Sequence, residues 1–267
     1  MVKHLFHDEY LRHSSYKSMT IRLLALGDCA WTVEFGTSIS PDLNALVMAF
    51  AHRIAQARKH EPVFATITDV VPTFRSLTVH FAPQTTDADA LATALIALAQ
   101  ESPEHRIKGR RWLLPACFDP TFAPDLSSWA KAKNVSEAQI IERLLNTQFR
   151  VYMIGFLPGF PYMGGLPSEL AMPRLSSPRQ RVSAHSIAIA GEMCAVYPWE
   201  SPGGWNLIGK TPVKLFDPSQ IGQPALLSAG DMVGWYAIDM KEYERLFKQC
   251  DTGAIQREAF LDTVETK

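Results

Sequence analysis

The chain of 267 residues lacks the features that mark several large classes of protein. Its 26 basic and 27 acidic side chains leave a net charge of −1, so no overall positive field attracts nucleic acid or an acidic membrane. No apolar run approaches the about 18 residues of a membrane-spanning helix. The first 19 residues carry acids, bases and histidines where a secretory signal has an apolar centre. We therefore expect a cytoplasmic protein that binds neither nucleic acid nor membrane.

Cysteine and the short catalytic motifs are equally sparse. The four cysteines are far apart and contain no C-x-x-C, which excludes a zinc knuckle and a disulfide framework and fits a reducing compartment. The sequence contains no G-x-S-x-G, no H-E-x-x-H and no paired-carboxylate motif. Cys194 has no evident histidine partner, so we expect a buried structural thiol rather than a nucleophile. The sequence predicts no metal and no covalent mechanism carried by this chain alone.

Regular patterns begin at Thr20. Apolar and β-branched runs predict strands at 21–26, 29–35, 63–71 and 77–81. Helical spacing of apolar residues predicts one helix from Ser40, a capping residue followed by Pro41, to residue 59, and a second helix at 87–100. A ββαββα order is typical of an α+β fold with its helices on one face of an antiparallel sheet. We predict a flexible extension at 1–19 and a small α+β domain at 20–103.

The second half of the chain differs in composition and in the length of its apolar runs. A polar linker at 101–111 precedes a predicted strand at 112–118 and a helix at 136–145. Eight of the 15 glycines and eight of the 18 prolines then lie between residues 155 and 212. Short β-like runs alternate with them, at 150–156, 185–191, 194–198, 212–216 and 232–238. This punctuation is typical of a β-barrel or sandwich, which we place at 104–240, followed by a helix and tail at 241–267.

One stretch matches a nucleotide-binding motif by its letters. "GWNLIGKT", residues 204–211, fits the phosphate-binding P-loop pattern G-x-x-x-x-G-K-[ST]. A P-loop must lead into a helix whose amides hold the phosphates, but Pro212 follows Thr211 at once and disfavours helical angles there. The residues after it, "VKLFDP", alternate like a strand. We therefore interpret the match as accidental and place a stand-alone nucleotide hydrolase last among the functions considered.

Two stretches combine glycine, proline and large aromatic residues, at 155–167 and 201–212. Aromatic groups held on stiff loops lose little entropy when they bind a partner. Between them lie Arg174 and Arg179, whose planar guanidinium groups suit a carboxylate or phosphate. The alternative is that the arginines pair with internal acids and the aromatic rings fill a core. We favour a site, with binding residues Phe156, Gly159, Phe160, Tyr162, Gly203, Gly204, Trp205, Lys210 and Thr211.

These residues carry a family resemblance. The chain resembles the family of 5-oxoprolinase B subunits and the kinase A inhibitor (KipI), also called allophanate hydrolase subunit 1. The pattern GF-x-PGF-x-Y is met from Gly155 to Tyr162, and YP-x-x-[ST]-PGGW-x-LIG-x-T from Tyr197 to Thr211. Arg174 and Arg179 meet a PR-x(4)-PR-like segment, and "LFDP" at 215–218 and "AGD" at 229–231 also follow the family. The likeness covers residues 20–238.

The resemblance implies a fold, an activity and partners. The fold is an α+β N-terminal domain followed by a mainly-β, cyclophilin-like barrel. The activity is ATP-dependent hydrolysis of 5-oxoproline to glutamate, in a complex with a larger related C-type subunit and with an A-type subunit. ATP would act in the assembled complex, and the chain alone would be inactive. Relatives also form part of urea carboxylase, and one inhibits a histidine kinase. A non-catalytic regulator that binds a histidine kinase and a urea carboxylase- or allophanate hydrolase-related subunit therefore stay as alternatives.

The sequence departs from the family pattern beside the predicted site. The usual VPAGSVGI-x-G reads "VSAHSIAIAG" here, with Ser183 in place of proline and His185 in place of glycine. Met193–Ala195 replaces QTG, and Leu144 stands where the family commonly has histidine. His185 is a candidate acid or base because imidazole titrates near neutrality. More often, however, a lone histidine in a strand is simply a tolerated, hydrogen-bonded residue. The predicted catalytic group is Arg174, Arg179 and His185.

Overall fold

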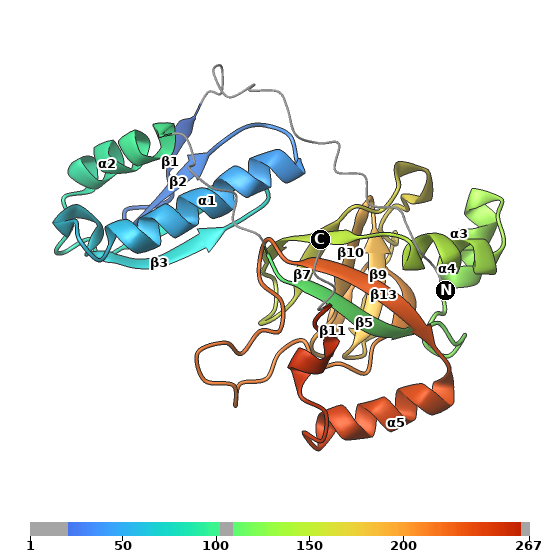
Figure 1. The fold of residues 1–267 in the computed structure, drawn as a ribbon. Helices are drawn as coiled ribbons and strands as arrows, with labels where there is room; N and C mark the ends of the chain where they lie inside the picture. The colour runs from blue at the N-terminus through green and yellow to red at the C-terminus, as the bar shows by residue number, and fades with distance from the viewer. Residues whose placement is uncertain (1–20, 102–108, 263–267) are drawn as a thin grey trace, which may run out of the picture.

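The computed structural model describes residues 21–101 and 109–262. The predicted N-terminal extension, most of the predicted linker and the last five residues lie outside this range. Figure 1 shows a four-stranded sheet with two helices at one end of the molecule and a barrel at the other. Within the described residues, every helix is too short or too polar to cross a bilayer.

The four-stranded sheet is antiparallel, in the order β1-β2-β4-β3. Its strands are β1 (Arg22–Ala25), β2 (Ala30–Glu34), β3 (Ile67–Pro72) and β4 (Ser76–Phe81). Its helices are α1 (Pro41–Ala57) and α2 (Ala88–Gln100). The side chains of Ser40 and Asp87 cap the two helices, as the sequence predicts for Ser40. Both helices share one apolar core with the sheet, built on Val33, Phe50, Leu77 and Leu91.

One predicted strand starts later than its sequence pattern indicates. Residues Pro62–Phe64 form a short 3-10 helix, and β3 begins only at Ile67. Phe64 is buried although it lies in this turn. Phe64 is therefore buried while it lies in a helical turn. A run of apolar residues does not by itself distinguish such a turn from a strand.

The second half of the chain forms a closed barrel, in the order β10-β7-β6-β13-β5-β12-β9. Its strands are β5 (Arg111–Cys117), β6 (Phe149–Ile154), β7 (Pro161–Gly164), β9 (Ser186–Ala190), β10 (Met193–Val196), β12 (Asn206–Lys210) and β13 (Met232–Ile238). All pairs are antiparallel except β5 with β13. The structure confirms a barrel and excludes the sandwich. A two-stranded sheet of β8 (Arg179–Val182) and β11 (Ser201–Gly203) lies beside it.

Among the described residues, five helical segments accompany the barrel. These are α3 (Leu126–Lys133), α4 (Glu137–Leu145), α5 (Met240–Asp251) and the short 3-10 helices η3 (Ser168–Leu170) and η4 (Arg257–Phe260). The sequence predicts α4 and α5, and Ser136 caps α4 in a reciprocal capping box. Sequence reasoning missed α3, a polar segment that buries only Leu126, Trp129 and Ala130. The strand predicted at 212–216 is wrong, because only Phe216 makes an isolated bridge there.

A buried carboxylate holds one end of the barrel. Asp231 precedes β13 and is only 2% exposed. Its oxygens accept hydrogen bonds from the Arg110 backbone (2.8 Å), the Trp112 indole (3.0 Å) and the Ser228 backbone (2.9 Å), and Nη2 of Arg110 lies 3.2 Å away. Both oxygens are therefore occupied by donors, and the loop before β5 is tied to the loop before β13.

Replacing this carboxylate by an amide tests the arrangement. In Asp231→Asn one oxygen becomes an NH2 group that faces donors, so we expect the free energy of unfolding to fall by about 1–3 kcal/mol. The matched control is Asp251→Asn, which removes an exposed ion pair with Lys214 worth at most about 1 kcal/mol. Denaturant unfolding of the two variants is the measurement. Equal stability losses would contradict the role given to Asp231.

Candidate functional site

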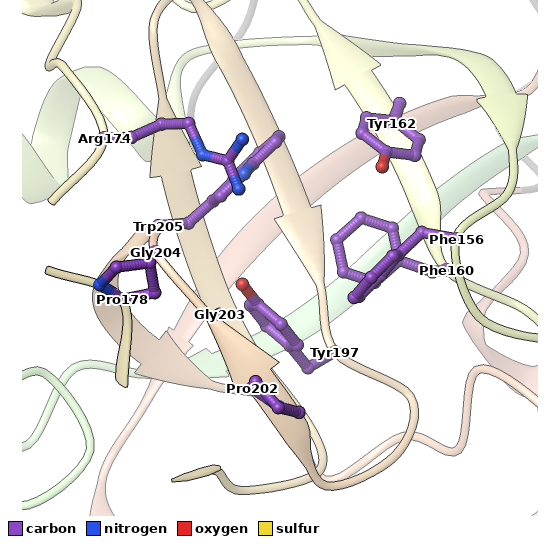
Figure 2. A pocket seen from close by; sticks show the side chains of 10 residues that line it. All are labelled: Phe156, Phe160, Tyr162, Arg174, Pro178, Tyr197, Pro202, Gly203, Gly204 and Trp205. Atoms are coloured by element: carbon purple, nitrogen blue, oxygen red, sulfur yellow. The ribbon is translucent and has the colours of Figure 1, made fainter. Parts of the chain in front are cut away.

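A cavity of about 300 Å³ lies against the barrel wall between the loop after β6 and the β8–β11 sheet. Its lining residues are Phe156, Phe160, Tyr162, Arg174, Pro178, Tyr197, Pro202, Gly203, Gly204 and Trp205. Figure 2 shows Arg174, Pro178 and Trp205 on one side and Tyr162, Phe156 and Phe160 on the other. The two glycine–aromatic stretches of the sequence therefore meet at one pocket.

The pocket lies on the outer face of the barrel, and the strand sequences explain why. Side chains alternate across a strand, so Ile187 and Ile189 of β9 point into the barrel core while Ala188 and Ala190 belong to the outer cluster. Strand β10 repeats the pattern, with Val196 inside and Ala195 outside. The small alanines outside leave room for the aromatic rings. The barrel interior is filled by apolar side chains, and the cavity lies on the outer face.

The pocket wall is a cluster of aromatic rings around Phe160. Its ring centroid lies 5.0 Å from Tyr162, 5.1 Å from Tyr197, 5.4 Å from Phe156 and 6.2 Å from Trp205. Tyr162 and Trp205 also contact each other edge to face at 5.9 Å. Sequence analysis predicts exposed rings on loops, and that is wrong for most of them. Phe156 is 64% exposed, but Trp205 is 8% and Phe160 2% exposed.

Two glycines border the pocket for different reasons. A Cβ at Gly203 would overlap the buried Tyr197 ring, 2.7 Å from its Cζ. A Cβ at Gly204 would make only ordinary contact, 3.5 Å from Pro178 and 3.8 Å from the Arg174 Nε. Gly203 therefore allows strand β11 to approach the Tyr197 ring closely, whereas a Cβ at Gly204 fits without displacing its neighbours.

Arg174 supplies the positive charge of the pocket. Its side chain is exposed, and it has no ion-pair partner among the residues that the structure describes. Burial raises the phenol pKa of Tyr162 and of Tyr197, and the nearby Arg174 charge opposes this shift in both. Both hydroxyls therefore stay protonated near neutral pH. The pocket offers one cation, two phenol groups and aromatic walls, which suits a small ring with an anionic group.

Arg179 lies outside the pocket lining. Its Nη2 forms an ion pair with Asp125 at 2.7 Å, and the other Asp125 oxygen accepts the Leu207 backbone N–H at 2.6 Å. Asp125 precedes α3, so this pair joins that loop to strands β8 and β12. The sequence left open whether Arg179 binds a ligand or pairs with an internal acid. The contact in the structure is the ion pair with Asp125.

His185 also points away from the pocket. Its backbone N–H donates to the Tyr197 carbonyl at 2.6 Å, but its ring packs against Phe247 of α5, with centroids 5.7 Å apart. It has φ +68°, a left-handed conformation that is uncommon outside glycine. Burial and then the charge of Lys210 lower its pKa, and its buried Nδ1 has no hydrogen-bond partner. The structure does not bring His185 to the two arginines.

The P-loop letters belong to a barrel strand. Asn206–Lys210 is β12, and the next helix of the described chain begins only at Met240. A strand rises about 3.3 Å per residue, so Lys210 lies roughly 16 Å along β12 from Trp205. There its ammonium group rests over the Phe122 ring at 5.1 Å, and Thr211 is fully buried beside it. The rejection of a phosphate-binding loop is confirmed, and neither residue lines the pocket.

Other predicted positions serve the fold around the pocket. Gly159 has φ +78° and a Cβ there would lie 2.7 Å from the Phe216 Cβ, so it shapes the loop without lining the cavity. Cys194 is fully buried in the barrel core, and burial raises its thiol pKa, as expected for a structural cysteine. Leu144 is buried in the same core. The described cysteines are all free.

Sequence reasoning missed three lining residues: Pro178, Tyr197 and Pro202. The signal for Tyr197 and Pro202 is present, because both belong to the Tyr-Pro and Pro-Gly-Gly-Trp parts of the motif from 197 to 211. Pro178 directly precedes Arg179, the residue that the sequence analysis placed at the site. A proline beside a glycine-rich edge is a pointer to a rigid pocket rim.

Comparison with known proteins agrees with the motifs. The model of the carboxyltransferase domain, subdomain C and D, matches residues 21–227. A Bacillus subtilis (strain 168) protein, named as the B subunit of 5-oxoprolinase, is 37% identical over 238 residues, covering 84% of this chain and 97% of that protein. The solved structure of TTHA0988 is similar with TM-score 0.67 and 30% identity over 82% of this chain, which spans only 40% of that one. Kluyveromyces lactis urea carboxylase shares the fold, with TM-score 0.74, 20% identity and coverage of 92% and 24%.

The two pocket glycines provide a paired test. Gly203→Ala must displace the packed Tyr197 ring, so we expect a loss of about 1–3 kcal/mol in the free energy of unfolding and a changed tyrosine environment by near-ultraviolet circular dichroism. Gly204→Ala should leave both unchanged within about 0.5 kcal/mol. The account of Gly203 is wrong if both variants behave alike.

Proposed function

This chain belongs to the carboxyltransferase-domain family, subdomains C and D, and from that premise we propose that it is the B subunit of an ATP-dependent 5-oxoprolinase. The complex opens the lactam ring of 5-oxoproline to give glutamate. The chain acts with a larger homologous subunit, and with one of A type, and is inactive alone. Its barrel is of the cyclophilin-like kind. The names of its relatives support this assignment, since they are called subunits of that enzyme.

One observation carries the proposal: an arginine without an acidic partner among the described residues stands in a small aromatic pocket. 5-Oxoproline is a five-membered ring with one carboxylate, one lactam carbonyl and one lactam N–H. A guanidinium group binds the carboxylate through two parallel hydrogen bonds, and the aromatic walls contact the ring. Urea has no ring and no charge, so it would use neither feature.

The residues then have separate tasks. Arg174 binds the substrate carboxylate and thereby orients the ring. Tyr162 and Tyr197, whose hydroxyls stay protonated, donate hydrogen bonds to polar groups of the ring. Gly203 and Gly204 line the pocket, and a backbone amide there would stabilise negative charge that develops on the carbonyl oxygen. Arg179 is a positioning residue, because it holds β8 and β12 through Asp125.

ATP, when bound in the complex, would supply a phosphoryl group to the lactam oxygen, which would make the ring carbon more electrophilic toward water. The residues of this chain that match a P-loop do not fit that ligand, because they form strand β12 and no helix of the described chain begins after them until Met240. We therefore propose that the nucleotide is bound by one of the partner proteins. The contribution of this chain is to bind and orient the small substrate.

The two arginines separate binding from folding. In the complex with the larger partner, Arg174→Ala should weaken 5-oxoproline binding about tenfold to a hundredfold, since a charged hydrogen bond contributes about 1.5–3 kcal/mol. Its free energy of unfolding should stay unchanged because the side chain is exposed, and Arg174→Lys should restore part of the affinity. Titration calorimetry and denaturant unfolding measure the two effects.

Arg179→Ala serves as the matched arginine control. It leaves Asp125 without its cation partner, so the free energy of unfolding should fall by about 1–3 kcal/mol. Full substrate affinity in the complex with Arg174→Ala would contradict the proposed function. Urea is the control ligand and should not bind. Binding of urea as tight as that of 5-oxoproline would argue for a urea-related activity instead.

A further inference from the structure

A buried asparagine ties the four-stranded sheet to the barrel. Asn44 of α1 is 0% exposed, and its Nδ2 donates to the Thr73 carbonyl at 3.2 Å and to the Tyr152 carbonyl at 3.0 Å. Its Oδ1 accepts from Nε of Arg150 at 3.2 Å. Thr73 belongs to the turn between β3 and β4, whereas Arg150 and Tyr152 belong to β6. One side chain thus fixes the turn against a barrel strand.

The turn itself is firmly held on the sheet side. Thr73 donates its backbone N–H and its hydroxyl to the Ser76 carbonyl, at 2.8 and 3.0 Å. Arg75 forms an ion pair with Glu34 of β2 at 2.6 Å and donates to the Gly36 carbonyl. The residue between these anchors, Phe74, therefore has a defined place at the tip of the turn.

The Phe74 ring reaches the pocket wall. Its centroid lies 5.8 Å from the Tyr152 ring and 5.8 Å from the Tyr162 ring, the latter contact being edge to face. Tyr162 is a lining residue, and its ring also meets Phe160 and Trp205. The β3–β4 turn thus supports from behind a ring whose other neighbours form the pocket.

We propose that Phe74 is a positioning residue that sets the place of the Tyr162 ring in the pocket, with Asn44 locking its turn onto the barrel. The four-stranded sheet thereby takes part in substrate binding without touching the substrate. We therefore expect that a change in the position of the β3–β4 turn alters the affinity of the pocket for its substrate. The affinity part of this inference rests on the proposed function, whereas the placement of Tyr162 does not.

Three variants of the full chain test it. Phe74→Ala removes the ring, and Phe74→Tyr keeps it. Phe122→Ala is the matched control, since that ring also packs on a tyrosine, Tyr243, at 4.6 Å, but away from the pocket lining. In the complex, Phe74→Ala should weaken 5-oxoproline binding about threefold to tenfold, as expected for the loss of one aromatic pair. Phe74→Tyr and Phe122→Ala should bind like the unmodified chain.

A second readout needs no ligand. In chain labelled with 3-fluorotyrosine, the fluorine resonance of Tyr162 is assigned by its absence in Tyr162→Phe. Phe74→Ala should shift this resonance and lower the pKa at which it titrates, because the ring gains contact with water and burial is what raises that pKa. Phe122→Ala should leave the Tyr162 resonance in place and move that of Tyr243.

The outcomes are distinguishable. An unshifted Tyr162 resonance in Phe74→Ala overturns the proposal, and so does a shifted resonance with unchanged 5-oxoproline affinity. If the unmodified complex binds no 5-oxoproline, the proposed function fails, and the fluorine resonance alone then decides whether Phe74 positions Tyr162. A loss of affinity in Phe74→Ala together with rescue in Phe74→Tyr supports both.

Discussion

The ring of Phe160 is the point on which the pocket is built. It touches four other aromatic rings that come from the loop after β6, from β7, from the end of β10 and from the start of β12. The chain can deliver it there because Gly159, at φ +78°, turns against the Phe216 side chain where a Cβ would collide. The Phe160 ring is almost completely buried, and its four neighbours all pack against it.

The barrel provides two faces from one set of strands. On β9 and β10, isoleucine and valine side chains join the apolar interior, and the alanines between them form a shallow outer floor on which the aromatic cluster rests. A packed interior makes the barrel a rigid support for the segments next to its strands, which carry most of the lining residues of the pocket. The β8–β11 sheet adds the proline and glycine rim, and the Arg179–Asp125 pair fixes that rim to the wall.

Local patterns predicted most of the elements, and distant pairings account for what they did not predict. The caps at Ser40 and Ser136 and the spacing of apolar residues place helices correctly because those signals act within one turn. The motifs placed Phe160, Tyr162, Arg174 and Trp205 at one site, and the pocket lining contains all four. Arg179 pairs with an acid 54 residues away, a contact that spacing along the chain cannot reveal. The composition of residues 204–211 is typical of a loop, yet five of them form the barrel strand β12. One end of this strand follows Trp205 of the pocket, and the other end is Lys210, which packs on Phe122.

The central claim is that the outer pocket, and no other part of the described chain, receives the carboxylate of the substrate. A crystal structure of the complex with 5-oxoproline tests it most directly. The account predicts that the ligand carboxylate lies within hydrogen-bond distance of the Arg174 guanidinium, with its ring against Phe160 and Trp205. Density for the ligand at the opposite end of β12, beside Lys210 and His185, with the aromatic pocket filled only by water, would contradict it.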